Sequence, residues 1–136
     1  MSKSILFFIP AILAAAGAVS APDINEVYDG YMLMVPLMSF STYLVDTDES
    51  IAHTWTSNYR PGNSAYLLTD GTMLRTGRLT NGNRFSGTGG MGGIVEKLDW
   101  NSNVTWSFSY ATDEYCLHHD VEQLPNGNIL MIAWEY

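Results

Sequence analysis

The chain is poor in cysteine and in basic residues, and each of these two shortages excludes a class of protein. Cys116 is the only cysteine, so an internal disulfide framework is excluded. Six Lys and Arg face fourteen Asp and Glu, for a net charge of −8. Phosphate binding needs clustered Lys and Arg, so nucleic acid and anionic membrane are not expected partners. The sequence after residue 20 also has no long amphipathic helical pattern, so short elements must build the core.

The N-terminus has the pattern of a secretory signal peptide. Lys3 is followed by a short apolar run, interrupted by Pro10, and then by the small residues of Ala-Val-Ser. The run is short for a membrane span, which needs about 20 residues, although an uncleaved anchor stays an alternative. We expect residues 1–20 to be removed, which leaves 116 of the 136 residues and places the mature protein outside the cell or in a periplasm, with no membrane contact.

The remainder predicts an all-β fold made of many short strands. Apolar or alternating runs are separated by turn residues, as in Asp70-Gly71 and Pro125-Asn126-Gly127. The segment 31–38 contains Pro36, so it is an edge strand at best. The other predicted strands are 41–46, 50–55, 65–69, 72–78, 93–99, 104–110, 119–124 and 128–134.

An internal repeat organises these strands. One alignment places Trp55 against Trp106, 51 residues apart, and another places Asp70-Gly71 against Asn126-Gly127, 56 residues apart. Four strands in about 50 residues are typical of a β-propeller blade. We therefore predict a lead-in at 21–41 and a partial propeller at 42–136, with two blade-like units at about 42–79 and 93–136.

Two blades cannot close a ring, because propellers typically use four to eight. The sequence ends at Tyr136 within or just after a predicted strand. We therefore expect the N-terminal part of a longer protein, and we expect residues 21–136 alone to fold poorly or to associate through open blade faces.

Three motifs have weaker functional interpretations. Gly87, Gly89 and Gly92 form a GxGxxG pattern, but a strand rather than a helix is predicted after it, so a loop is favoured over a nucleotide site. The Cys116 to Asp120 segment carries zinc-ligand types, but successive strand residues point to opposite faces, so no metal site is expected unless a bulge intervenes. The tryptophans are expected in the core rather than on a sugar-binding platform.

The segments GGIVEKLDWNSNVTWSFSY and HHDVEQLPNGNILMIAWE together resemble the arylsulfotransferase family of secreted and periplasmic β-propellers. The resemblance covers residues 42–136, and its most specific part is the His-Asp pair followed by Leu-Pro-Asn-Gly-Asn. The earlier unit has Leu68-Thr69-Asp70-Gly71-Thr72 but no His-Asp before it.

The resemblance implies sulfuryl transfer from an aryl sulfate to a phenol through a histidine, without a nucleotide donor or other cofactor. His119 matches the motif as the catalytic candidate, and His118 is an extra neighbour with at most a supporting role. No arginine can be matched. Neutral imidazole is a competent nucleophile near pH 7. Three alternatives stay open: a supporting role for His119 with the nucleophilic histidine in further blades, a structural His-Asp pair that ties blade to blade, and a non-catalytic extracellular module that binds or assembles.

Overall fold

The computed structural model describes residues 29–80 and 82–136, and in these residues the chain is all-β. The predicted signal peptide lies outside the described residues. The strands are β1 (Met32–Met34), β2 (Ser41–Val45), β3 (Ile51–Thr56), β4 (Pro61–Leu67), β5 (Met73–Arg78), β6 (Gly93–Leu98), β7 (Val104–Ser109), β8 (Tyr115–Gln123) and β9 (Ile129–Glu135). The described residues include no helix long and apolar enough to span a membrane. The predicted all-β class is confirmed.

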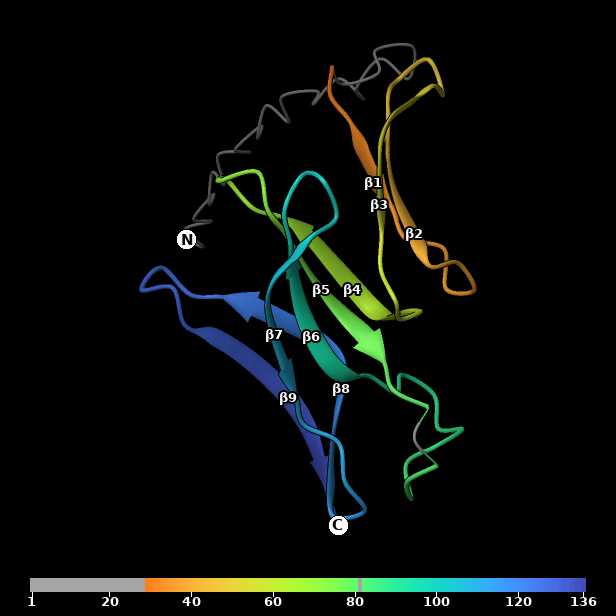
Figure 1. Ribbon diagram of the computed structural model, residues 1–136, viewed down its shortest axis with the longest axis vertical. Coiled ribbons are helices and arrows are strands. Elements are labelled where there is room, and N and C mark those ends of the chain that lie inside the picture. Colours follow the sequence, from red (N-terminus) through yellow and green to blue (C-terminus); the bar gives the residue numbers. More distant parts are fainter. Residues whose placement is uncertain (1–28, 81) are drawn as a thin grey trace, which may run out of the picture.

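The strands form three layers that lie side by side (Figure 1). The first is the sheet β1-β2-β3. The second is the antiparallel meander β4-β5-β6-β7, and the third is the hairpin β8-β9. The third layer joins the second through one parallel pair, Asn63 with His119, which gives a curled six-stranded sheet in the order β7-β6-β5-β4-β8-β9.

The two middle strands of the central layer, β5 and β6, are buried on both faces. Met73 of β5 packs with Leu44 and Trp55 of the first layer, whereas the next residue, Leu74, packs with Leu117 and Val121 of β8. Neighbouring residues of a strand point to opposite faces, so β5 contributes to two separate cores. This explains why β5 and β6 are buried along most of their length.

A buried ion pair lies in the contact between the first and second layers. Arg75 of β5 donates to the Glu96 carboxylate of β6 at 2.9 Å, and the two side chains are 1% and 2% exposed. The Ser57 hydroxyl donates to the same Glu96 oxygen at 2.7 Å, and Arg75 also donates to the Tyr59 carbonyl at 3.0 Å. Burial lowers the pKa of Arg75, and the Glu96 charge acts in the opposite direction. The pair therefore fixes the position of the β3–β4 link against the central sheet.

The hairpins β2-β3 and β6-β7 are copies of one another with a spacing of 53 residues. Their turns begin at Asp46 and Asp99 and have the same hydrogen bonds, and Glu49 and Ser102 have φ of 69° and 68°. Both hairpins also have a register shift at the same position. This spacing makes Phe108, and not Trp106, the equivalent of Trp55, so the predicted alignment of the two tryptophans is wrong by two residues.

The hairpins β4-β5 and β8-β9 are copies with a spacing of 56 residues, which agrees with the predicted alignment of their turns. Gly71 and Gly127 both have φ of 83° and donate to the carbonyl three residues earlier. Asn63 and His119 occupy equivalent positions and both have positive φ, of 118° and 54°. β4 and β8 each begin four residues before their predicted starts, because each continues through a bulge.

The strand β1 belongs to a third copy. Asp29-Gly30-Tyr31-Met32-Leu33 follows the pattern of Asp70-Gly71-Thr72-Met73-Leu74. Met32 pairs with Val45 as Met73 pairs with Leu98, and Val45 is the equivalent of Leu98. The predicted lead-in therefore contains a strand of the repeat, at the sheet edge where an edge strand was expected.

The sheets do not follow the predicted blade-like units at 42–79 and 93–136. β2 and β3 pair with β1, while β4 and β5 continue into β6 and β7. The complete four-stranded meander therefore spans 61–109. The order of strands along the chain does not determine which four strands form one sheet, because a sheet can begin at any strand of a four-strand repeat.

Candidate functional site

The two candidate histidines meet at a bulge in β8, where this strand touches β4. The pairing of β8 with β9 shifts between Leu117 and Val121, and His119 has φ of 54°. As a result, the Nδ1 atoms of His118 and His119 lie 2.6 Å apart. The prediction that the two side chains point to opposite faces is wrong, because strict alternation holds only in regular strand backbone.

His118 is the more enclosed of the pair. Its ring stacks on Trp134 of β9, with centroids 4.3 Å apart and planes 10° from parallel, and Trp134 also stacks on Phe85. Desolvation lowers the pKa of His118, and the neighbouring His119 lowers it further. Both effects favour the neutral imidazole form of His118.

His119 is exposed and lies against the glycine-rich loop. Its backbone N–H donates to the Gly90 carbonyl at 3.0 Å. A Cβ on Gly90 would overlap the imidazole ring of His119, and φ at Gly90 is 76°, so glycine is needed for this close approach. The loop is followed by β6 and not by a helix, as predicted. The glycines thus allow close packing beside the histidine.

The Nδ1 contact determines how the pair can share protons. Neutral imidazole carries one N–H and one acceptor nitrogen. If the Nδ1–H of His119 donates to Nδ1 of neutral His118, the Nε2 lone pair of His119 is left unprotonated. His118 then fixes the tautomer of His119, which is the task that a carboxylate or carbonyl performs for other reactive histidines.

Asp120 interacts with β4 and has no hydrogen bond to either histidine. Its Oδ1 accepts from the Tyr66 hydroxyl at 2.6 Å and from the Val121 N–H at 2.9 Å. The Tyr66 hydrogen bond is the main reason that the pKa of Asp120 is lowered, and it also raises the pKa of Tyr66. The sequence left open a His-Asp pair that ties neighbouring layers together. In the structure, Asp120 makes such a contact with Tyr66 and not with a histidine.

Replacing Tyr66 by Phe is expected to raise the pKa of Asp120 toward its ordinary range. Since the folded-state pKa is lowered, the hydrogen bond stabilises the fold above the ordinary pKa of Asp120 and loses this effect as the pH falls through the lowered value. An NMR titration of the Asp120 carboxyl measures the shift. Asp70, whose pKa is lowered by Thr72, is the matched control and should not change. An unchanged Asp120 titration would rule out the Tyr66 contact.

Cys116 lies two residues before His118 but is buried as a free thiol. Burial raises its pKa, which disfavours the thiolate form that binds metals. In the parts of the chain that the structure describes, no three His, Cys, Asp or Glu residues come close enough to hold a metal ion. The bulge in β8 does bring His118 and His119 together. Two imidazoles are the only metal-ligand types that meet there among the described residues.

The sequence predicted the histidines but not their surroundings. Trp134 was expected in the core or between layers, and it stacks on His118. Gly90 was assigned to a loop, and Tyr66 was not singled out. The usable signal was the spacing of 56 residues, since it makes His119-Asp120 the equivalent of Asn63-Ser64, and the structure pairs Asn63 with His119.

No family model matches the chain, and neither does a curated protein or a solved structure.

Proposed function

We propose that the chain belongs to an exported β-propeller of arylsulfotransferase type, in which His119 carries a sulfuryl group from an aryl sulfate to a phenol. The observation that carries the proposal is the His118–His119 contact of 2.6 Å. When the Nδ1–H of His119 is the donor in this contact, Nε2 of this exposed histidine is available as a nucleophile, and neutral His118 fixes the tautomer.

The arrangement of the layers supports the propeller part of the proposal. Propeller blades are four-stranded sheets placed around a central channel, and each blade packs on its neighbours. Here the middle strands of a four-stranded meander pack on β2-β3 through one face and on β8 through the other. The first strand of the meander, β4, and the first strand of the next copy, β8, run parallel where they meet at His119. His119 would then lie on the channel side of the blades.

The proposed reaction has two balanced steps. In the first, the Nε2 lone pair of His119 forms an N–S bond while the S–O bond to the aryl group breaks, and the phenolate leaves with the electron pair. The Nδ1 proton of His119 can pass to Nδ1 of His118, which relieves the positive charge of the sulfated ring. In the second, the oxygen of the acceptor phenol bonds to sulfur and its proton goes to solvent, while the N–S electron pair returns to Nε2 of His119 and the Nδ1 proton returns from His118 to His119.

A transfer assay tests the proposal in the full chain. The protein is incubated with a chromogenic aryl sulfate, with and without a second phenol, and both the released phenol and the sulfated acceptor are measured. We expect release that depends on the acceptor and yields sulfated product. A chelator should leave the rate unchanged, because no step uses a metal. Release without transfer, or no release at all, would contradict the proposal.

A second candidate function is an extracellular module that binds or assembles without catalysis. The large apolar side chains exposed on β7 and β9 favour it, since monomers usually avoid contiguous apolar surface. They include Trp106, Phe108, Leu130 and Ile132. Stable association together with no sulfuryl transfer would support this function instead.

A further inference from the structure

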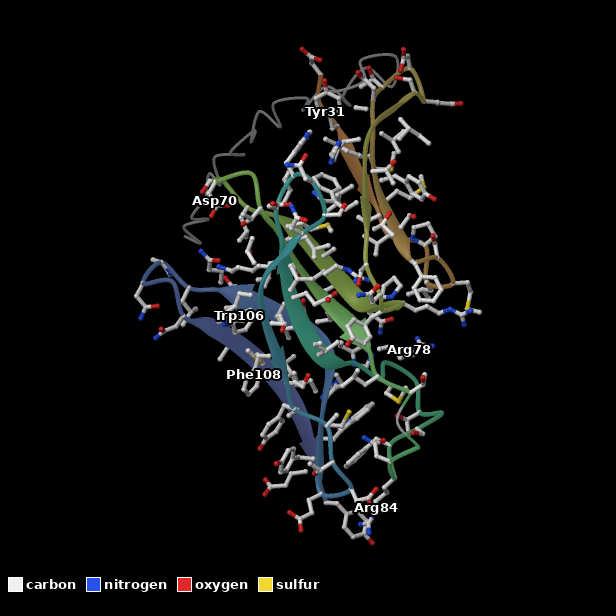
Figure 2. All side chains as sticks on the ribbon, viewed as in Figure 1. Tyr31, Asp70, Arg78, Arg84, Trp106 and Phe108 are labelled. Atoms are coloured by element: carbon white, nitrogen blue, oxygen red, sulfur yellow. The ribbon has the colours of Figure 1, made fainter. Side chains whose placement is uncertain are left out.

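An open apolar groove lies between β7 and β9. It measures about 600 Å³ and is lined by Lys97, Trp106, Phe108, Gly127, Asn128, Ile129 and Met131. Trp106 and Phe108 follow one another along β7 (Figure 2), and they are 37% and 42% exposed. All the groove side chains except Lys97 are uncharged, so the groove is suited to apolar packing.

The preceding copy of the repeat shows what covers the equivalent surface. Trp55, the equivalent of Phe108, is fully buried against Met73 and Leu98. Met73 belongs to β5. The residue equivalent to Met73 in the groove is Ile129, which belongs to β9. Leu98 belongs to β6, which pairs with β5, and β9 has no such neighbour on its outer edge within the described residues. In the part of the chain that the structure describes, the groove is therefore not covered by a hairpin of the β6-β7 type.

The chain carries a second hairpin of this type at its other end, namely β2-β3. Its outer neighbour is β1, which makes only three residue pairs with β2, whereas β5 makes six with β6. Among residues 29–80 and 82–136, none covers the outer face of this layer. It has a groove of about 1120 Å³ that includes Met32, Tyr43, Val45 and Ile51 among its lining residues.

We propose that a second copy of this chain fills the groove, with its β2-β3 hairpin adding to the edge of β9 and β9 taking the place of β1. The four strands β8 and β9 of one copy and β2 and β3 of the next then form one composite sheet. The contact is heterologous, so successive copies form a ring or an open chain. This proposal is independent of the sulfuryl-transfer proposal, because it is based on the repeat geometry alone.

The repeat sets the register of the composite sheet. β9 should pair with the second copy's β2 as β5 pairs with β6. In this register, Ile129, Met131 and Ala133 of one copy lie opposite Val45, Tyr43 and Ser41 of the second copy, respectively. Phe108 then lies against Ile129 of its own copy and Val45 of the second copy, as Trp55 lies against Met73 and Leu98. Both open grooves are closed by one contact.

Cysteine cross-linking between full chains tests the register. Ser41→Cys and Ala133→Cys are prepared as separate variants, and directly opposed residues of antiparallel strands are close enough for a disulfide. After mild oxidation, a mixture of the two should give a mixed dimer, while neither variant alone should cross-link. Ser41→Cys mixed with Leu130→Cys is the off-register control and should not react.

Light scattering on the wild-type chain provides the second readout, with association expected and weakened by Phe108→Ala. A monomer in light scattering with no mixed dimer would overturn the proposal. Cross-linking of Ala133→Cys with itself would also overturn it, because it would show that β9 pairs with another β9. Neither result would change the outcome of the sulfuryl-transfer assay.

Discussion

Replacing Arg75 by Ala is expected to lower the free energy of unfolding by about 3–5 kcal/mol, the usual cost of removing one partner from a buried ion pair. Glu96 would be left 2% exposed with only the Ser57 hydroxyl as a partner. A buried carboxylate without its cation must stay charged at a high desolvation cost, take up a proton or draw water into the interface. Urea denaturation monitored by circular dichroism measures the change.

Two further variants separate the charge effect from packing. Arg75→Met combined with Glu96→Leu removes both charges and keeps apolar volume, so it should recover most of the lost stability. Met38→Ala alters an exposed side chain in a loop and should change stability by less than about 0.5 kcal/mol. If Arg75→Ala costs less than about 1 kcal/mol, the pair is not buried as described.

Replacing His119 is expected to reduce sulfuryl transfer by a factor of about a hundred or more, which is typical when a positioned proton-handling or charge-stabilising group is lost. Asn is the better substitute, because Asn63 occupies the equivalent position in β4 with positive φ, and asparagine tolerates that conformation. His119→Asn should therefore lose transfer with little change in melting temperature. His119→Ala should lose both transfer and some stability.

His118 is expected to matter less, and through its effect on His119. His118→Ala removes the acceptor that fixes the His119 tautomer, so the rate should fall by about tenfold and the pH profile should change. His118→Asn, whose amide oxygen can accept from Nδ1 of His119, should restore part of the rate. If His119→Asn keeps full transfer, or if only stability falls, the histidine pair is structural.

The sequence could predict strand positions and turns, because both depend on local patterns. Alternation, Asp-Gly and Pro-Asn-Gly turns gave the positions of β5, β6, β7 and β9 to within one or two residues. The 56-residue spacing of the two turns was also right, since Gly71 and Gly127 have the same conformation.

Other features depend on backbone irregularities and on pairing between distant strands. The bulge at His119 reverses the expected direction of a side chain, and no neighbouring position in the sequence is a glycine that would have indicated positive φ. The alignment of Trp55 with Trp106 relied on residue identity, whereas the structure conserves turn geometry and places Phe108 in that role. The division into sheets depends on whether β4 pairs with β3 or β8, which local patterns do not determine.

Trapping the intermediate tests the proposed function most directly. The full chain is incubated with an aryl sulfate in the absence of acceptor and digested under neutral or alkaline conditions, and its peptides are analysed by mass spectrometry. The account predicts one sulfuryl group on His119, absent in His119→Asn and lost when a phenol is added. A chain that releases phenol but carries no adduct, or one whose adduct lies on another residue, would contradict it.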